Sequence, residues 1–238
     1  MYRDITFADK NPLKRWLQKQ RLSTALRVSR DALSNASAIC DYGAGDGELC
    51  KHIAVLAPHA RILCFEPSPD LMNQARQNLE GVDKVSFCTE SQQLPMNSVD
   101  VAFCLEVFEH LPCAETRDAI ARLSVTLKPN GLLIVGVPVE VGVAALYKGA
   151  FRLFRRAGDF DANWRNIAAA ALGSPPTERP VREIAPSLNY YPHHMGFDYR
   201  TFVEQLQGSD LMLESRSFSP FNVPGSLMPE AYFLLRKL

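Results

Sequence analysis

Ile39-Cys40-Asp41-Tyr42-Gly43-Ala44-Gly45-Asp46-Gly47 is the stretch that decides the fold. It begins as a short apolar run that fits a buried strand, continues as an acidic, glycine-rich turn, and leads into residues 48–53, which have the pattern of a helix. Glycines allow positive φ and let a ligand lie against bare backbone, while a helix start offers free N–H groups. The stretch therefore predicts a nucleotide-sized site between a strand and a helix.

The spacing of the glycines distinguishes two kinds of nucleotide site. A dinucleotide fingerprint, G-x-G-x-x-G, would place its third glycine at position 48, but the chain has Glu48 there and Gly47 one step earlier. This spacing disfavours a dinucleotide oxidoreductase. Asp41 closes the strand, so the pattern is acid-x-G-x-G-x-G.

Length, composition and charge indicate the class of protein. The 238 residues, 47% hydrophobic and 22% charged, suit one large α/β domain with an insertion. The net charge is zero, which argues against a nucleic-acid partner because such binding rests on phosphate neutralisation. Without an apolar leader or a run of membrane-spanning length, the sequence predicts a cytoplasmic protein with no transmembrane segment.

Neither the cysteines nor the group of Glu106, Glu109 and His110 predicts a metal site. Six cysteines form no C-x-x-C pair, and four of them lie inside apolar runs, where free cysteine acts as a small buried hydrophobe. Glu106, Glu109 and His110 match neither H-E-x-x-H nor H-x-x-E-H, which excludes a zinc protease. We therefore expect no metal.

The N-terminal part of the chain is basic. Residues 1–30 hold eight Lys or Arg against two acids, and the apolar spacing from Pro12 to Leu33 predicts a helix or helix pair. This segment either packs on the edge of the main domain or offers a basic surface to an anionic partner, and the first interpretation is favoured. We assign residues 1–36 to an N-terminal helical segment and 37–238 to the main domain.

Strands and helices alternate after the opening stretch. The expected strands are 61–66, 85–88, 99–105 and 132–137. One expected helix begins at Pro67 and Ser68 and runs to about Leu79, and another covers 113–127. Repeated βα units build a doubly wound α/β fold with a mostly parallel sheet, whose ligands bind at the carboxyl ends of the strands. Residues 138–195 break the pattern and predict an α-rich lid that holds the substrate, with helices over 143–156 and 163–172. A helix over 199–207 and strands over 211–218 and 231–236 complete the chain.

Glu66 is the second candidate binding residue. It lies 19 residues after Gly47, at the end of the second expected strand, where a carboxylate can accept hydrogen bonds from both hydroxyls of a ribose. An isolated acid at a strand end is usually only solvated. At this spacing from the glycine turn, binding is the favoured interpretation.

Five motifs in order, from about residue 37 to 137, resemble those of class I S-adenosylmethionine (SAM)-dependent methyltransferases. After the glycine turn they are Glu66-Pro67-Ser68-Pro69-Asp70-Leu71-Met72, Glu90 with Leu94-Pro95, Leu105-Glu106-Val107-Phe108-Glu109-His110-Leu111, and Leu127-Lys128-Pro129-Asn130-Gly131. Glu90 replaces a more common Asp and Asn130 replaces a Gly. The resemblance implies a seven-stranded sheet of order 3-2-1-4-5-7-6 with its last strand antiparallel.

The resemblance also implies which residues bind SAM. The methionine part would meet Asp41 and the backbone of Gly43, Ala44, Gly45 and Gly47, and the ribose would meet Glu66, beside Pro67 and Ser68. The adenine would lie near Met72 and face Glu90 and Ser91, and Leu105 would offer its backbone to the amino group of SAM. Met72 has an alternative role in plain helix packing, because flexible methionines fill gaps in many cores.

Three histidines are the catalytic candidates. His110 follows the fourth expected strand, near where the methyl acceptor would lie, and imidazole suits a general base near pH 7. Its alternative is a structural histidine bonded beneath the lid. His193 and His194 stand beside two tyrosines, and one of them is a candidate for substrate contact or base.

The sequence thus predicts a SAM-dependent methyltransferase that moves the sulfonium methyl group to an O, N or C acceptor on a small molecule. Arginines of the lid are candidates to hold an anionic acceptor. One alternative is a non-catalytic SAM-binding module. Another is a peripheral membrane methyltransferase with a lipid-like acceptor, whose 143–156 helix lies on anionic lipid. The sequence does not indicate the oligomeric state.

Overall fold

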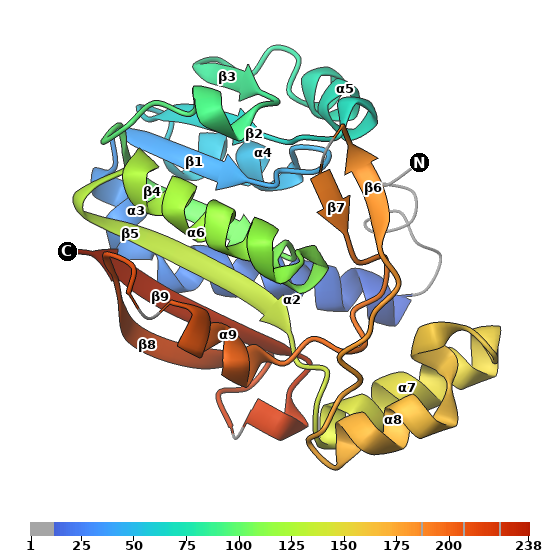
Figure 1. Ribbon diagram of the computed structural model, residues 1–238. Coiled ribbons are helices and arrows are strands. Elements are labelled where there is room, and N and C mark those ends of the chain that lie inside the picture. Colours follow the sequence, from blue (N-terminus) through green and yellow to red (C-terminus); the bar gives the residue numbers. More distant parts are fainter. Residues whose placement is uncertain (1–11, 187, 207, 224) are drawn as a thin grey trace.

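A central sheet lies between two layers of helices (Figure 1). The computed structural model describes residues 12–186, 188–206, 208–223 and 225–238. The seven strands of the sheet are β1 (Ala38–Tyr42), β2 (Arg61–Phe65), β3 (Val85–Cys88), β4 (Val99–Leu105), β5 (Leu127–Pro138), β8 (Leu211–Ser219) and β9 (Glu230–Lys237). Their order is β3-β2-β1-β4-β5-β9-β8, and β9 runs antiparallel to both of its neighbours. Within this sheet β8 and β9 are the sixth and seventh strands, so the expected order is confirmed.

Alternate residues of the central strands face opposite layers, which gives the sheet two hydrophobic cores. Along β4, Val101 and Phe103 belong to one core while Ala102 and Cys104 belong to the other. The first core packs under α2 (Pro12–Val28), α3 (Arg30–Asn35), α4 (Glu48–Leu56) and α5 (Pro69–Asn78). The second packs under α6 (Cys113–Thr126) and α9 (Tyr199–Gln205). Both faces are therefore covered, as in a doubly wound fold.

The N-terminal helix α2 packs on the sheet. The hydroxyls of Thr24 and Ser219 are 3.1 Å apart, and the Tyr232 hydroxyl donates to the Arg21 carbonyl at 3.1 Å. Arg21 pairs with Glu106 at 3.0 Å and with Glu230. These contacts agree with the first of the two interpretations of the basic segment. Residues 1–11 of that segment lie outside the described residues.

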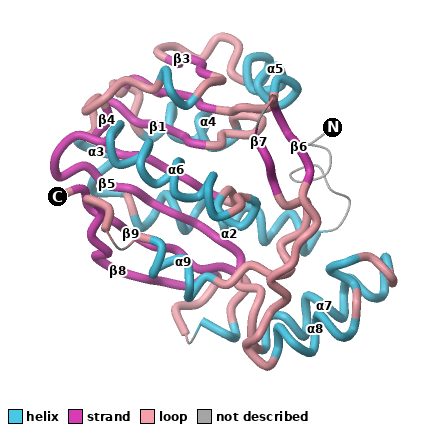
Figure 2. The backbone as a smooth tube through the Cα atoms, in the orientation of Figure 1, coloured by secondary structure: helices cyan, strands magenta, loops and turns pink. Residues whose placement is uncertain are grey.

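The insertion contains a helical hairpin followed by a small separate sheet (Figure 2). Its helices are α7 (Val143–Arg156) and α8 (Trp164–Ala171), with the short turn η3 (Phe160–Ala162) between them, and its strands are β6 (Arg182–Ala185) and β7 (Leu188–Tyr190). The insertion is rich in helix, as expected, but it also contains β6 and β7, which were not predicted. Strands of four and three residues with no buried side chain show too little alternation to be read from sequence.

β3, β4 and α7 have their expected limits, and the other expected elements differ from the observed ones by a few residues. β5 begins at Leu127, before the expected strand, and its pairing with β4 shifts from Val99↔Leu127 to Val101↔Leu132. Asn130 in this irregular part has φ 62°, the left-handed conformation that the replacement of glycine by asparagine allows. All six cysteines are free. No helix in the described ranges combines the length and apolar character needed to cross a bilayer.

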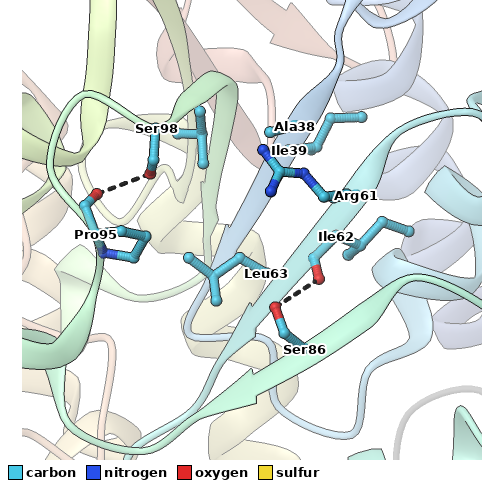
Figure 3. A pocket seen from close by; sticks show the side chains of 9 residues that line it. Ala38, Ile39, Arg61, Ile62, Leu63, Ser86, Pro95 and Ser98 are labelled. Carbon is cyan, nitrogen blue, oxygen red and sulfur yellow. Dashed lines mark hydrogen bonds between the residues drawn. The ribbon is translucent and has the colours of Figure 1, made fainter.

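A small hollow lies where β1, β2 and β4 begin (Figure 3). Ala38, Arg61 and Val99 are among its lining residues. Its volume is about 110 Å³, whereas pockets for small ligands typically have roughly 300–1,000 Å³. Because ligands of parallel sheets bind at the opposite, carboxyl ends of the strands, this hollow is not the candidate site.

Candidate active site

The glycine turn joins β1 to α4 in the conformation that only glycine adopts easily. Gly43, Gly45 and Gly47 have φ of 80°, 57° and 79°. The backbone N–H groups of Gly43 and Ala44 both donate to the Phe65 carbonyl at 2.8 Å, which fixes the turn to the end of β2. A Cβ on Gly43 would lie 2.4 Å from Cγ2 of Val107. The turn is therefore held tightly against the segment that follows β4.

Glu66 connects this turn to the start of α5. One carboxylate oxygen accepts from the Gly45 N–H and the other from the Ser68 N–H, both at 2.9 Å. The side chain is only 4% exposed, and burial raises its pKa to about 7, although the two amide donors act in the opposite direction. Each carboxylate oxygen has further acceptor capacity, so Glu66 can still receive the hydroxyls of a ribose.

Asp41 and Met72 are two predicted cofactor residues whose side chains are deeply buried. Asp41 is 3% exposed, accepts a hydrogen bond from the Cys50 thiol at 3.4 Å, and has a pKa raised to about 7 by burial. Met72 on α5 is 2% exposed, as plain helix packing would also require. Direct contact of either side chain with a cofactor therefore stays a prediction.

The remaining predicted cofactor residues lie around the same edge. Pro67 is half-buried and Ser68 is buried between β2 and α5. Glu90 is exposed and accepts from the Gln93 side chain at 2.8 Å, and Ser91 beside it begins the short turn η1 (Ser91–Gln93). Leu105 is half-buried at the end of β4. The carboxyl ends of β1, β2, β3 and β4 thus supply all twelve predicted positions, either directly or through the segments that follow.

Two of the three candidate histidines come together directly after β4. His110 ends the short turn η2 (Phe108–His110), and its ring lies 4.8 Å from the His194 ring in an edge-to-face arrangement. Nδ1 of His110 is 2.7 Å from the Tyr191 carbonyl, and the Tyr191 N–H donates back to the His110 carbonyl at 2.7 Å. Burial lowers the pKa of both imidazoles. His110 is thus hydrogen-bonded to the insertion, as expected if it is a structural histidine and not a general base.

A buried carboxylate faces these two rings. Oε1 of Glu109 lies 3.8 Å from Nε2 of His110 and 3.9 Å from Nε2 of His194, and the Glu109 side chain has no exposed surface. Burial raises the pKa of Glu109. The third candidate histidine, His193, points elsewhere, with Nδ1 3.4 Å from Asp161.

The insertion contributes a set of charged residues whose roles were not predicted individually. Glu140 is fully buried and accepts two hydrogen bonds from Arg152 at 2.8 Å and one from Lys148 at 3.1 Å. These cations hold its pKa well below the usual range. Arg152 also pairs with Asp161 at 3.5 Å. Two basic residues of α7 are therefore already neutralised by buried acids.

Arg179 was also missed as a site residue. Its guanidinium lies 4.0 Å over the Tyr191 ring and donates to the carbonyls of Glu109 and His193. In the sequence it stands in an irregular Pro-rich stretch with no motif around it, so no local signal marks it. Only the folding of the insertion against the end of β4 brings it to the histidines.

The comparisons with known proteins agree with this geometry. A family model described as "Methyltransferase domain" matches residues 40–133, from β1 into β5. This stretch contains the glycine turn, Glu66 and the segment after β4. The resemblance of the sequence motifs to class I SAM-dependent methyltransferases is thus accompanied by a methyltransferase family model that matches 94 of the 238 residues.

Two curated relatives share the name trans-aconitate 2-methyltransferase. The one from Afipia carboxidovorans is 25% identical over 78% of this methyltransferase and 75% of its own length. The one from Methylobacterium nodulans is 27% identical over 60% of this chain, which spans about half (53%) of that relative. The solved N-methyltransferase NodS from Bradyrhizobium japonicum, in complex with S-adenosylhomocysteine, has a TM-score of 0.58 at 16% identity over 96% of this chain and 89% of its own. That structural likeness concerns the fold.

The turn of this methyltransferase fits a SAM molecule. A Cβ at Gly43 or Gly47 would meet a neighbouring side chain within 3 Å, so packing against Val107 and Leu79 requires glycine at both positions. Glu66 keeps acceptor capacity 21 residues from Gly45, to which it is bonded. The chain's own residues are therefore suited to hold the ribose and the methionine part.

Proposed function

We propose that this methyltransferase transfers the SAM methyl group to a carboxylate oxygen of a small organic acid. The observation that carries this proposal is the position of Arg179, a cation near His110 that forms no ion pair within 4 Å in the described part of the chain, although the buried Glu109 and Glu140 act on it electrostatically. No carboxylate in the described part of the chain pairs with Arg179, and its Nε has no hydrogen-bond partner there. Burial lowers its pKa to about 10, so the guanidinium stays charged at neutral pH.

A planar guanidinium matches a carboxylate better than it matches any neutral acceptor. Two parallel N–H groups can bind both carboxylate oxygens, and partial burial strengthens such a pair. The two curated relatives named trans-aconitate 2-methyltransferase support the same class of acceptor, because aconitate is a carboxylic acid. The other insertion cations, Lys148 and Arg152, are paired with Glu140 and are less suited to this role.

Bound SAM supplies an electrophilic methyl group on a sulfonium. In this proposal the glycine turn and Glu66 hold the cofactor at the carboxyl ends of β1 and β2, and Arg179, bonded to the segment after β4, orients the acceptor. Such orientation can contribute roughly 7–11 kcal/mol towards lowering the barrier. A carboxylate is already ionised at neutral pH, so this acceptor needs no general base, and His110 and His194 are free for another role.

We also propose that residues 138–195 act as the lid over the acceptor. The β6–β7 hairpin stands at the side of the sheet towards which the arrowheads of β1 and β5 point (Figure 1). Tyr191, His194 and Arg179 all come from this insertion and contact the segment after β4. A cover there would exclude water from a reaction in which charge separation falls. The domain limits at residues 36 and 37 and the cytoplasmic location stay predictions from sequence.

Transfer of radioactivity tests the acceptor class. The protein is incubated with [methyl-³H]SAM and a set of di- and tricarboxylic acids, and products are treated with mild alkali, which releases methanol from methyl esters. We expect alkali-labile, volatile radioactivity and, for Arg179→Gln, a KM for the acid raised at least tenfold with an unchanged Kd for SAM. Arg155→Gln, on the exposed end of α7, is the matched control. Alkali-stable product, or an unchanged KM in Arg179→Gln, would contradict the proposal.

A further inference from the structure

The cluster of Glu109, His110 and His194 has the composition and the geometry of a metal site. Each residue offers one ligand atom, and these atoms all lie within 4.8 Å of one another. The two imidazole Nε2 atoms are 3.8 and 3.9 Å from the same oxygen of Glu109, too far for a hydrogen bond. Ligand atoms bound to one ion at about 2.0–2.2 Å lie roughly 3–3.5 Å apart, so a small inward movement would complete the set.

The buried carboxylate is a second and independent observation. Neither oxygen of Glu109 reaches a hydrogen-bond partner in any other described residue, and the side chain has no exposed surface. A buried carboxylate without partners is costly, and proteins normally pair such groups or use them to coordinate metals. The unpartnered oxygens lie beside the two histidines, which a bound cation would join to them.

The hydrogen bond on the far side of His110 suits metal binding. Its Nδ1 lies 2.7 Å from the Tyr191 carbonyl, which can only accept, so Nδ1 carries the proton. Nε2 is then unprotonated and keeps its lone pair towards Glu109. Metal-bound histidines usually have their second nitrogen fixed in this way by a carbonyl or carboxylate. For His194, Nδ1 lies 3.9 Å from Glu140, which is beyond hydrogen-bond distance.

We infer that Glu109, His110 and His194 bind one first-row divalent transition-metal ion such as zinc. Two imidazoles and one carboxylate suit these ions, whereas magnesium and calcium prefer oxygen ligands. The third ligand lies 84 residues from the second, which is why no short sequence motif revealed the set.

Three protein ligands leave coordination positions open, which is the pattern of catalytic rather than structural zinc sites. The His110 and His194 side chains are 29% and 28% exposed while Glu109 is fully buried, so an ion bound by them would be accessible from the histidine side. An acceptor carboxylate oxygen would occupy one of the open positions, opposite Arg179. This last role rests on the proposed function, but the binding of the ion does not.

Metal titration of the full chain tests the inference without using activity. Protein freed of metal with a chelator is titrated with Zn²⁺ by calorimetry and with Co²⁺ by visible absorption, and the Glu109→Gln and His194→Ala variants are titrated alongside. His52→Ala is the control, because the exposed His52–Glu48 pair at 3.5 Å is the place where a surface ion would bind adventitiously. Circular dichroism verifies that each variant is folded.

We expect one ion per wild-type chain and visible Co²⁺ absorption bands typical of a low coordination number. The affinity for the ion should fall at least 100-fold in Glu109→Gln and His194→Ala and stay unchanged in His52→Ala. If a variant does not fold, the Co²⁺ spectrum and stoichiometry of the wild type decide the question alone. Absence of saturable binding, or loss of binding only in His52→Ala (an adventitious ion only), would overturn the inference. Methyl ester formation by metal-free protein that binds no ion would refute the metal site while leaving the proposed function intact.

Discussion

Position 43 requires glycine for two separate reasons, its backbone conformation and its packing. Its φ of 80° strains any other residue, and a Cβ would collide with Val107. We therefore expect Gly43→Ala to lower the free energy of unfolding by more than the strain alone, and to weaken SAM binding by moving the turn. Urea denaturation and calorimetric titration with SAM measure the two effects.

Gly81 provides a matched control for this prediction. Its φ is 76°, but a Cβ there would meet nothing within 4 Å. Gly81→Ala should therefore carry only the conformational strain, on the order of 1–3 kcal/mol, and leave SAM affinity unchanged. Equal losses in the two variants would show that the contact with Val107 has no energetic importance.

The raised pKa of Glu66 predicts that its contribution to the stability of the protein decreases as the pH rises. Its pKa of about 7 in the folded protein lies above the ordinary value of 4.5, so the folded state binds the proton more tightly than the unfolded state. The contribution of Glu66 to stability is therefore greatest at low pH and is lost as the pH rises through about 7, by up to roughly 3 kcal/mol.

Comparison with Glu66→Gln isolates this effect from other groups such as Asp41. The difference in unfolding free energy between wild type and variant should fall as the pH rises from 5 to 8, measured by urea denaturation without SAM. SAM binding should show the opposite trend, because ribose hydroxyls donate best to the ionised carboxylate. A difference in stability that grows with pH would refute the assignment.

At the scale of elements, one cation of α2 forms ion pairs with two residues of the sheet region. Arg21 pairs with Glu106, directly after β4, and with Glu230, at the start of β9. Removing it leaves two largely buried carboxylates without this partner, so Arg21→Gln should destabilise the protein by roughly 3 kcal/mol. Arg27→Gln, on the exposed face of the same helix, should change the stability by less than about 0.5 kcal/mol. Similar midpoints of thermal unfolding for the two variants would contradict this account of α2.

The elements that the sequence predicted best are those defined by local pattern. β3 and β4 have the predicted limits, because each is an apolar run bounded by polar turn residues. The glycine turn and Glu66 were also predictable, since their spacing along the chain is itself the signal. Arg179 could not be predicted, because its contact with Glu109 joins residues 70 positions apart.

At the scale of the whole molecule, two sets of residues meet at one edge of the sheet. Val107 lies against the glycine turn, and Glu109 and His110 follow it within three residues. The insertion then brings Arg179, Tyr191 and His194 to the same segment. The proposed cofactor residues follow sequence motifs that resemble those of methyltransferases, whereas the proposed acceptor residues come together only through the folding of this insertion.

The decisive property of this protein is methyl transfer from SAM to a carboxylate. The protein is mixed with [methyl-¹³C]SAM and a tricarboxylic acid, and ¹³C NMR follows the labelled carbon over time. The account predicts loss of the sulfonium methyl signal, an equal gain of a methyl ester signal, stoichiometric S-adenosylhomocysteine, and none of these changes with Glu66→Ala. A sulfonium signal that persists with every acid supplied, or an ester formed equally well by Glu66→Ala, would contradict it.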